Sequence, residues 1–368
     1  MRAWPAVQLR RSFCTWQTWP ARRHALALAL LLAVAVVRWG PWLFAATPLD
    51  DEAVYLVAFA ARAAGEPVYT GIFFYPPPFA DAGAWLLERF GTTGVLAVLR
   101  AINVAGLALL VWIAAAWLPL GWRGRVLAAT LVIALSPAVR LGLQWGNLSF
   151  AVAGPLVLGV LWAARRPLTS ALMLGLGLVI KPLAPGALVV LAVVRPRGAR
   201  WSRQQTAAVL GGALALALLL ATPGLIDFLD LRGGKGVTAR NASLHRVVYS
   251  VGHAAVGAAP SALALAALIA LATAAIGGWL SLRRRRACGP ASILSLATTV
   301  ALLATPLLWS HSLLLSLPTQ MMAVAIAASR RAQAEDAASR RARDYEIAVV
   351  VLRALAIHLS EGVGALDR

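Results

Sequence analysis

Long apolar runs alternate with short polar segments along most of the chain. A helix that crosses a bilayer needs about 20 apolar residues, and fewer are enough where the helix is broken or shielded by protein. The pattern therefore predicts an all-α polytopic membrane protein with about 10 or 11 transmembrane helices. The predicted spans are 25–46, 95–118, 126–139, 148–164, 168–181, 183–194, 205–223, 260–282, 291–309 and 312–328. A final run, 345–359, is either a short span or a helix on the membrane surface, because Arg353 and His358 interrupt it.

The composition agrees with this class, since 60% of the residues are hydrophobic, 13% are charged and the mean hydropathy is +0.76. The net charge of +20 does not indicate a nucleic-acid partner, because most arginines stand in short clusters between apolar runs, as in cytoplasmic loops. These clusters are Arg10/Arg11, Arg22/Arg23, Arg123/Arg125, Arg165/Arg166, Arg195 to Arg203, Arg283 to Arg286 and Arg330 to Arg343.

The acidic residues favour the same topology, with the N-terminus inside the cell. Between the first predicted span and the last, the acidic residues fall in the loops that lack these arginine clusters, which we predict on the extracytoplasmic side. They are Asp50, Asp51, Glu52, Glu66, Asp81, Glu88, Asp227 and Asp230. The abundance of Ala, Arg, Val and Gly is typical of a GC-rich bacterial genome, so we expect a multi-pass protein of the bacterial cell (plasma) membrane.

This topology divides the chain into three parts. Residues 1–24 form a basic cytoplasmic N-terminus, 25–328 a transmembrane domain, and 329–368 a basic cytoplasmic segment with a short C-terminal helix. Two outer loops are long, 47–94 and 224–259. The first is polar, aromatic and rich in proline, and the pattern predicts a helix at 53–64 and another at 80–90.

Three consecutive acids, Asp50, Asp51 and Glu52, follow the first span directly. Carboxylates beside a membrane helix are costly and often functional, and a carboxylate can take the proton of a hydroxyl that receives a sugar from a phosphate-linked donor. We choose Asp51 as this base, with Asp50 and then Glu52 as alternatives. The other interpretation is that all three only cap the following helix, whose first turn favours negative charge.

Lys181 stands within apolar sequence beside Pro182, at the outer end of a predicted span. A lysine there is expensive unless it meets an anion, and a lipid phosphate is a suitable partner. The alternatives are a side chain that reaches to the membrane surface or a structural ion pair. Arg140, and with less support Arg100 within a predicted span, are further candidates for binding a lipid phosphate.

Two further polar features are predicted at the outer side. Gln144-Trp145-Gly146-Asn147 forms a polar turn before a span, where amides beside a helix N-terminus can bind hydroxyls or a phosphate. Asn147-Leu148-Ser149 also matches a glycosylation sequon, which we interpret as chance. His311 begins another span and is either structural or functional.

Four blocks of the chain, in order, resemble glycosyltransferase family 87, the polyprenol-phosphate-mannose-dependent mannosyltransferases of the GT-C superfamily. They are Asp51-x-x-x-Tyr55 with Gly65-x-Pro67-x-Tyr69 and Tyr75-Pro76-Pro77; Gln144-x-x-Asn147; Ile180-Lys181-Pro182; and Pro306-x-x-Trp309-x-His311. The resemblance implies a GT-C fold with an outward-facing site and an acid of the first loop as base. It also implies substrate-binding roles for Tyr55, Tyr75, Gln144, Asn147, Lys181 and His311.

The chain departs from the family pattern at two places. Asp50-Asp51-Glu52 stands where the family usually has a single aspartate, and an Asp-Glu pair also resembles the protein O-mannosyltransferase and aminoarabinose-transferase branches of the superfamily. Asp51 is the matching residue whether the segment is compared with the single aspartate of the family or with the Asp-Glu pair of the other branches. The turn at Gln144 lacks the commoner Gly-Gln-x-Asn order, which leaves Trp145 unexplained.

The resulting prediction is an inverting glycosyltransferase that moves a hexose, expected to be mannose, from a polyprenyl phosphate to a hydroxyl of a lipid or glycan acceptor. Asp51 is the base, and Lys181, helped by Arg140 or His311, holds the leaving phosphate. No metal and no cofactor are expected, because cationic side chains can balance the phosphate charge. The alternatives are a transporter or flippase for a lipid-linked or small polar solute, and an assembly protein with an inactive site.

Overall fold

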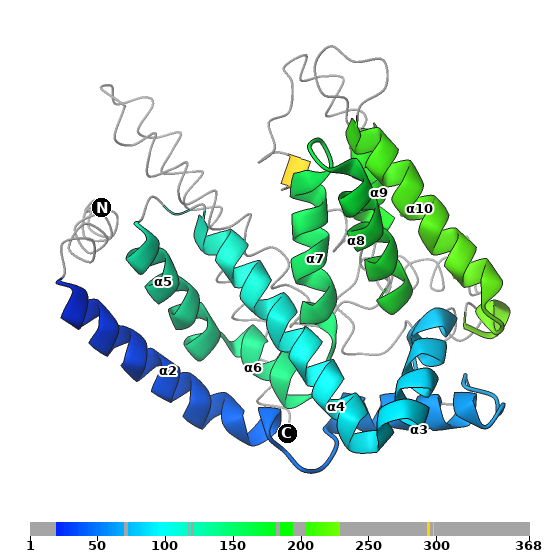
Figure 1. The fold of residues 1–368 in the computed structure, drawn as a ribbon, viewed down its shortest axis with the longest axis horizontal. Coiled ribbons are helices and arrows are strands. Elements are labelled where there is room, and N and C mark those ends of the chain that lie inside the picture. Colours follow the sequence, from blue (N-terminus) through cyan, green and yellow to red (C-terminus); the bar gives the residue numbers. More distant parts are fainter. Residues whose placement is uncertain are drawn as a thin grey trace, which may run out of the picture.

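The computed structural model describes residues 20–69, 73–116, 118, 121–181, 185–193, 203–228, 293, 294 and 297. Every regular element in these ranges is a helix, which confirms the all-α prediction (Figure 1). The helices are α2 (Ala21–Leu43), α3 (Asp50–Ala63), α4 (Pro77–Ala116), α5 (Trp122–Leu135), α6 (Pro137–Gln144), α7 (Ser149–Trp162), α8 (Pro167–Ile180), α9 (Pro185–Val193) and α10 (Arg203–Ala221). The spans predicted at 260–282 and 312–328, all but three residues of the span 291–309, the run 345–359, His311 and most of the loop 224–259 lie outside the described residues.

Three of these helices, α2, α4 and α10, are long and apolar enough to cross a membrane. The apolar surface of α2 is largely uncovered by protein, with Val37 78% and Leu26 63% exposed, as expected for a helix that faces lipid. The apolar helices α7 and α8 have 14 residues each and are about 21 Å long, less than the hydrocarbon core. Most of α7 is buried among other helices, and this shielding explains why a short helix is tolerated.

The helices run up and down in alternation, and α3 lies across one end of them (Figure 1). α4 packs against α3, α5 and α7, while α8 packs against α7 and α10. The described arginine pairs stand at the starts of α2 and α5 and in the turn between α7 and α8, at the end away from α3. The three acids at the start of α3 stand at the opposite end. The described arginine pairs thus lie at the end away from the three acids of α3, as the predicted topology requires, whereas single arginines such as Arg62 and Arg100 pair with acids.

One predicted span was wrong in its boundary. The span predicted at 126–139 is broken at Ser136-Pro137, where Ser136 accepts a hydrogen bond from the N–H of Val139 at 3.5 Å and the proline begins α6. The surface helix predicted at 80–90 agrees with the first part of α4, which is separated from the following span by the non-helical dihedral angles of Gly91. Gly91 has φ 63°, a conformation that glycine adopts without strain.

The predicted helix at 53–64 begins three residues earlier, at Asp50. Leu49 therefore precedes the helix, and the three acids form its first turn instead of a segment before it. This shift matters for the site, because it sets the direction of each carboxylate.

Candidate active site

The three acids of α3 have different environments although they are adjacent. Asp50 is exposed, Asp51 is partly buried and Glu52 is only 1% exposed. Successive residues of an α-helix point about 100° apart, so the three carboxylates cannot face one site together. All three also lie where a helix favours negative charge, which agrees with the capping interpretation.

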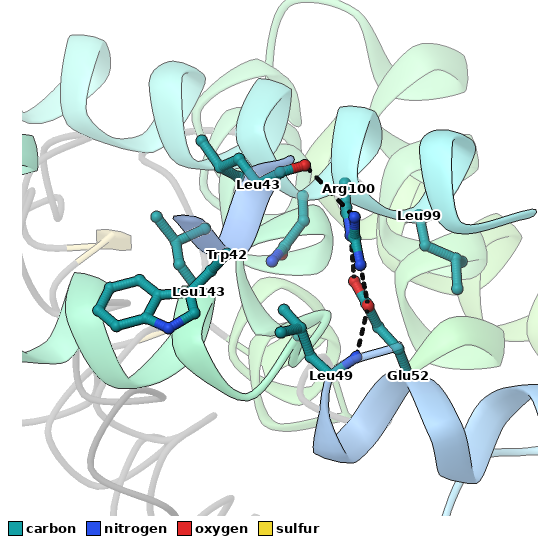
Figure 2. A pocket seen from close by; sticks show the side chains of 9 residues that line it. Trp42, Leu43, Leu49, Glu52, Leu99, Arg100 and Leu143 are labelled. Carbon is teal, nitrogen blue, oxygen red and sulfur yellow. Dashed lines mark hydrogen bonds and ion pairs between the residues drawn. The ribbon is translucent and has the colours of Figure 1, made fainter. Parts of the chain in front are cut away.

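Glu52 forms an ion pair with Arg100 of α4 (Figure 2). Nε of Arg100 donates to Oε1 at 2.8 Å and Nη2 donates to Oε2 at 2.7 Å, and Oε2 also accepts from the N–H of Leu49 at 2.9 Å. The guanidinium donates as well to backbone carbonyls of the segment before α3, those of Leu43, Ala45 and Thr47. We therefore interpret Glu52 and Arg100 as structural residues, because both oxygens of Glu52 and the guanidinium of Arg100 are engaged within the protein.

Removing one partner of this pair is expected to destabilise the protein. Glu52→Gln leaves the buried charge of Arg100 unbalanced, and we expect a loss of about 3–5 kcal/mol in the free energy of unfolding. The measurement is thermal or denaturant unfolding in detergent. Arg62→Gln is the matched control, because Arg62 pairs with Asp81 between the same two helices with side chains 24% and 42% exposed. It is expected to cost about 0–1 kcal/mol; equal losses for the two variants would contradict the structural role of Glu52.

Asp51 turns toward the segment before α7. Its N–H donates to the carbonyl of Trp145 at 2.8 Å, and its Oδ2 accepts from Nδ2 of Asn147 at 2.5 Å. Burial raises the pKa of the Asp51 carboxyl; the hydrogen bond from Asn147 and the charge of Lys181 oppose that rise, while Asp50 and Glu52 add to it. Trp145 contacts α3 through its backbone carbonyl, and this hydrogen bond does not involve the indole ring.

Asn147 links Asp51 to Lys181 through a single amide. Its Oδ1 accepts from Nζ of Lys181 at 2.7 Å, while its Nδ2 donates to Asp51. Nζ of Lys181 also donates to Oγ of Ser149 at 2.7 Å, and Ser149 donates its N–H and its hydroxyl to Asn147 Oδ1 at 3.0 and 2.7 Å. A carboxylate and an ammonium from distant parts of the chain therefore meet at one buried amide.

The turn that carries Asn147 depends on Gly146. Its φ is +69°, and a Cβ there would lie 2.6 Å from Cγ of Glu52. Glycine is required on both counts. The turn consequently packs directly on α3, which brings Asn147 within reach of Asp51.

Tyr55 and Tyr75 form the wall of this network on the side of α3. Their hydroxyl oxygens are 2.6 Å apart, and the ammonium of Lys181 lies 5.7 Å from the centroid of the Tyr75 ring, within reach of a cation–π interaction. Burial raises the pKa of the Tyr55 hydroxyl well above its ordinary value. The two rings belong to a packed aromatic cluster whose other members include Phe59, Phe73 and Phe79.

The remaining predicted residues lie outside this network or outside the described part of the chain. Asp50 is exposed beside Asp51, and Arg140 is exposed on α6. Gln144, the last residue of α6, is partly buried, and neither it nor Arg140 makes a side-chain hydrogen bond to another described residue. His311 is not among the described residues.

Sequence reasoning missed two members of the site, Ser149 and Asn103. Ser149 was visible as the third position of the sequon Asn147-Leu148-Ser149, and its hydroxyl donates to Asn147 Oδ1 at the start of α7. Asn103 is 3% exposed in the apolar second part of α4, and such a buried amide needs hydrogen-bond partners. Within the described ranges, no group of three or more His, Cys, Asp or Glu side chains could hold a metal ion.

The apolar helices, their lipid-exposed surfaces and the polar network at one end define a polytopic membrane protein of the all-α class. Residues 73–306 match the family model for glycosyltransferase family 87, which is more than half of the chain, and the chain belongs to that family. It is therefore a membrane glycosyltransferase of the GT-C type. Searches of the curated proteins and of the solved structures found no match.

The matched segment includes Tyr75, Asn147 and Lys181, but it begins after Asp51 and ends before His311. The family match therefore covers the helices that carry the ammonium and the amide. The carboxylate is tied to them by the hydrogen bond between Asn147 and Asp51.

Proposed function

We propose that this protein transfers a hexose, in the first instance mannose, from a polyprenyl-phosphate donor to a hydroxyl of a lipid or glycan acceptor, with inversion at the anomeric carbon. The observation that carries the proposal is the buried chain Asp51–Asn147–Lys181, which sets a base and a cation on either side of one amide. Membership of a glycosyltransferase family favours this activity over the transporter or flippase that the sequence left open.

The surroundings of Asp51 suit a general base. Asn147 holds Oδ2, while Oδ1 accepts no hydrogen bond from the described residues and can meet a hydroxyl. Burial raises the pKa of the carboxyl, which makes its ionised form a stronger acceptor of protons. Asp50 lacks this burial, so we assign the base to Asp51.

The surroundings of Lys181 suit the leaving phosphate. Lys181 is 8% exposed, and its ammonium donates hydrogen bonds to the side-chain oxygens of Asn147 and Ser149. A cationic donor forms stronger hydrogen bonds to a phosphate than a neutral donor does. The start of α7 at Ser149 adds the positive end of a helix dipole to the same place. Arg140 and His311 are further candidates for the phosphate.

The proposed reaction is a single displacement. The acceptor oxygen bonds to the anomeric carbon while its proton passes to the carboxylate of Asp51. The bond between that carbon and the phosphate oxygen breaks, and its electron pair leaves with the polyprenyl phosphate. The phosphate changes from a diester to a monoester and gains one negative charge, which Lys181 stabilises. No metal and no cofactor is required by this scheme.

We further propose that the reaction takes place on the extracytoplasmic side of a bacterial cell membrane. The arginine pairs of the described helices stand at the end away from α3, and positive residues collect in cytoplasmic loops. The end with Asp51 and Lys181 then faces outward.

The test is transfer by the purified protein in lipid vesicles. Incubation with radiolabelled polyprenyl-phosphate mannose and extracted glycolipids is expected to yield a labelled glycolipid whose new linkage has the opposite anomeric configuration from the donor. Parallel reactions with glucose and arabinose donors identify the sugar. Retention of configuration would contradict the single displacement, and loss of activity in a chelator would contradict the metal-free scheme.

A further inference from the structure

Asn103 occupies an unusual position for a polar residue. It lies in the apolar helix α4 and is 3% exposed. A buried amide is costly unless its hydrogen bonds are made, and both ends of this one are paired. Its Nδ2 donates to the carbonyl of Asn147 at 2.9 Å, and its Oδ1 accepts from the N–H of Ala151 at 3.1 Å.

The two backbone groups that Asn103 binds are four residues apart. In a continuous helix the N–H of Ala151 and the carbonyl of Asn147 would bond to each other. Here α7 begins at Ser149, so the N–H of Ala151 is among the donors that lack a partner within the helix. Asn103 supplies a partner to each group, and it thereby fixes the backbone of Asn147 relative to α7.

Glycines allow Asn103 to reach this turn. A Cβ on Gly106 of α4 would lie 2.1 Å from the carbonyl oxygen of Phe150, and one on Gly154 of α7 would lie 2.3 Å from the carbonyl oxygen of Gly106. The backbones of α4 and α7 are thus in direct contact, as at other close crossings of membrane helices with small residues. Gly106 is three residues after Asn103, so the two share one face of α4.

The side chain of Asn147 is the only link by hydrogen bonds between Asp51 and Lys181 in the described part of the chain. A small rotation of its backbone would move Nδ2 away from Asp51 and Oδ1 away from Lys181 together. We propose that Asn103 is a positioning residue for sugar transfer: its amide fixes the Asn147 backbone so that the Asn147 side chain orients both the base and the phosphate-binding ammonium. This inference rests on the function proposed above.

The test compares Asn103→Leu with Ser170→Ala. Asn103→Leu removes the amide and keeps the number and branching of the side-chain heavy atoms. Ser170→Ala is the matched control, because Ser170 of α8 is buried and its hydroxyl donates to the carbonyl of Gly159 at 2.7 Å. Like the bonds of Asn103, this one reaches the backbone of α7, but at the end far from Asn147. Asn103→Leu is expected to lower kcat by about 10- to 100-fold with a smaller change in KM, since displacement of reacting groups acts mainly on the chemical step. Ser170→Ala is expected to leave kcat within about twofold of the wild type.

The pH profile separates positioning from a merely structural effect. The hydrogen bond from Asn147 lowers the pKa of Asp51, so its loss shifts the acid limb of the kcat profile to higher pH. The other charges that act on Asp51 are Asp50 and Glu52 on α3 and Lys181 after α8; the two acids are not touched by the substitution, and a displaced Lys181 would shift the pKa of Asp51 in the same upward direction. Partial unfolding would scale the profile without moving it, and an unmoved acid limb in Asn103→Leu would overturn the proposal.

A second readout does not depend on transferase activity. Dicyclohexylcarbodiimide modifies protonated carboxyl groups, so its reaction with Asp51, followed by peptide mass spectrometry across pH, reports the titration of that residue. The midpoint is expected to rise in Asn103→Leu and to stay in place in Ser170→Ala. An unshifted midpoint overturns the positioning role, whereas a shifted midpoint in a protein without transferase activity overturns the proposed function alone. If the leucine variant does not accumulate, Asn103→Ser, which removes the amide with less strain, is measured in the same way.

Discussion

Asp51→Asn is expected to lower sugar transfer by about 10²- to 10⁴-fold, the usual contribution of a general base, while the protein accumulates normally. Asparagine has nearly the same size and can still accept the hydrogen bond from Asn147, so the fold of the site is kept. It cannot take up the proton of an acceptor hydroxyl. The measurement is the initial rate of labelled glycolipid formation in vesicles.

The pH dependence of the wild type provides a second check on this residue. The base acts in its ionised form, and burial raises the pKa of the Asp51 carboxyl. Activity is therefore expected to fall as the pH is lowered through that raised pKa, at a higher pH than for an ordinary surface carboxyl. This acid limb should be absent from the residual activity of Asp51→Asn.

Two neighbouring carboxylates serve for comparison. Asp50→Asn decides between the two candidate bases, and we expect it to retain most activity because Asp50 is exposed. Asp81→Asn is the matched control, since it removes an exposed carboxylate of α4 that pairs with Arg62. Full activity of Asp51→Asn, or a large loss only in Asp50→Asn, would remove Asp51 from the mechanism.

Lys181→Met is expected to lower kcat by about 10²- to 10³-fold, with a smaller rise in KM for the donor. Negative charge on the phosphate grows as the bond to the sugar breaks, so the ammonium acts most strongly in the transition state. Methionine keeps much of the lysine volume. Ser149 continues to donate to Asn147 Oδ1, so the substitution leaves that oxygen paired.

Lys181→Arg and Arg89→Gln complete this experiment. Arginine keeps the charge but carries a planar, larger head, and it should restore only part of the activity at so buried a position. Arg89 is exposed on the first part of α4, so its loss tests the general effect of removing a cation from the same end of the helices. A drop for Arg89→Gln that equals that of Lys181→Met would show that Lys181 acts only through the overall field of the protein.

Much of the fold could be predicted from the order of apolar and polar residues. Apolar runs form helices locally, and lipid requires their backbone groups to be paired within the helix, so the positions of α2, α7, α8 and α10 follow closely from sequence. The breaks were harder to predict. Pro137 begins α6 directly after α5 ends, and Gly91 interrupts α4 with non-helical dihedral angles. Local residue type does not reveal whether a helix resumes in the same direction after such a break.

The charged residues of the site were predicted from the sequence, but the hydrogen bonds that connect them were not. Asp51 and Lys181 were selected because a charge is costly in apolar sequence, and the structure links both to Asn147. Asn103 and Ser149 were missed, since a neutral polar side chain gives little signal without its partner. The expected roles of Arg140, Gln144 and His311 stay predictions.

The sequence by itself determined that this is a helical membrane protein, that its arginine clusters and its first acidic segment belong to opposite ends of the helices, and that this acidic segment and Lys181 are the places to look for chemistry. Only the tertiary structure decided which partner each acid binds: Glu52 forms an ion pair with Arg100, while Asp51 accepts a hydrogen bond from Asn147, 96 residues away in the chain. The physical reason is that helix formation is encoded by neighbouring residues, whereas the direction of each carboxylate depends on how separate helices rotate and pack against one another.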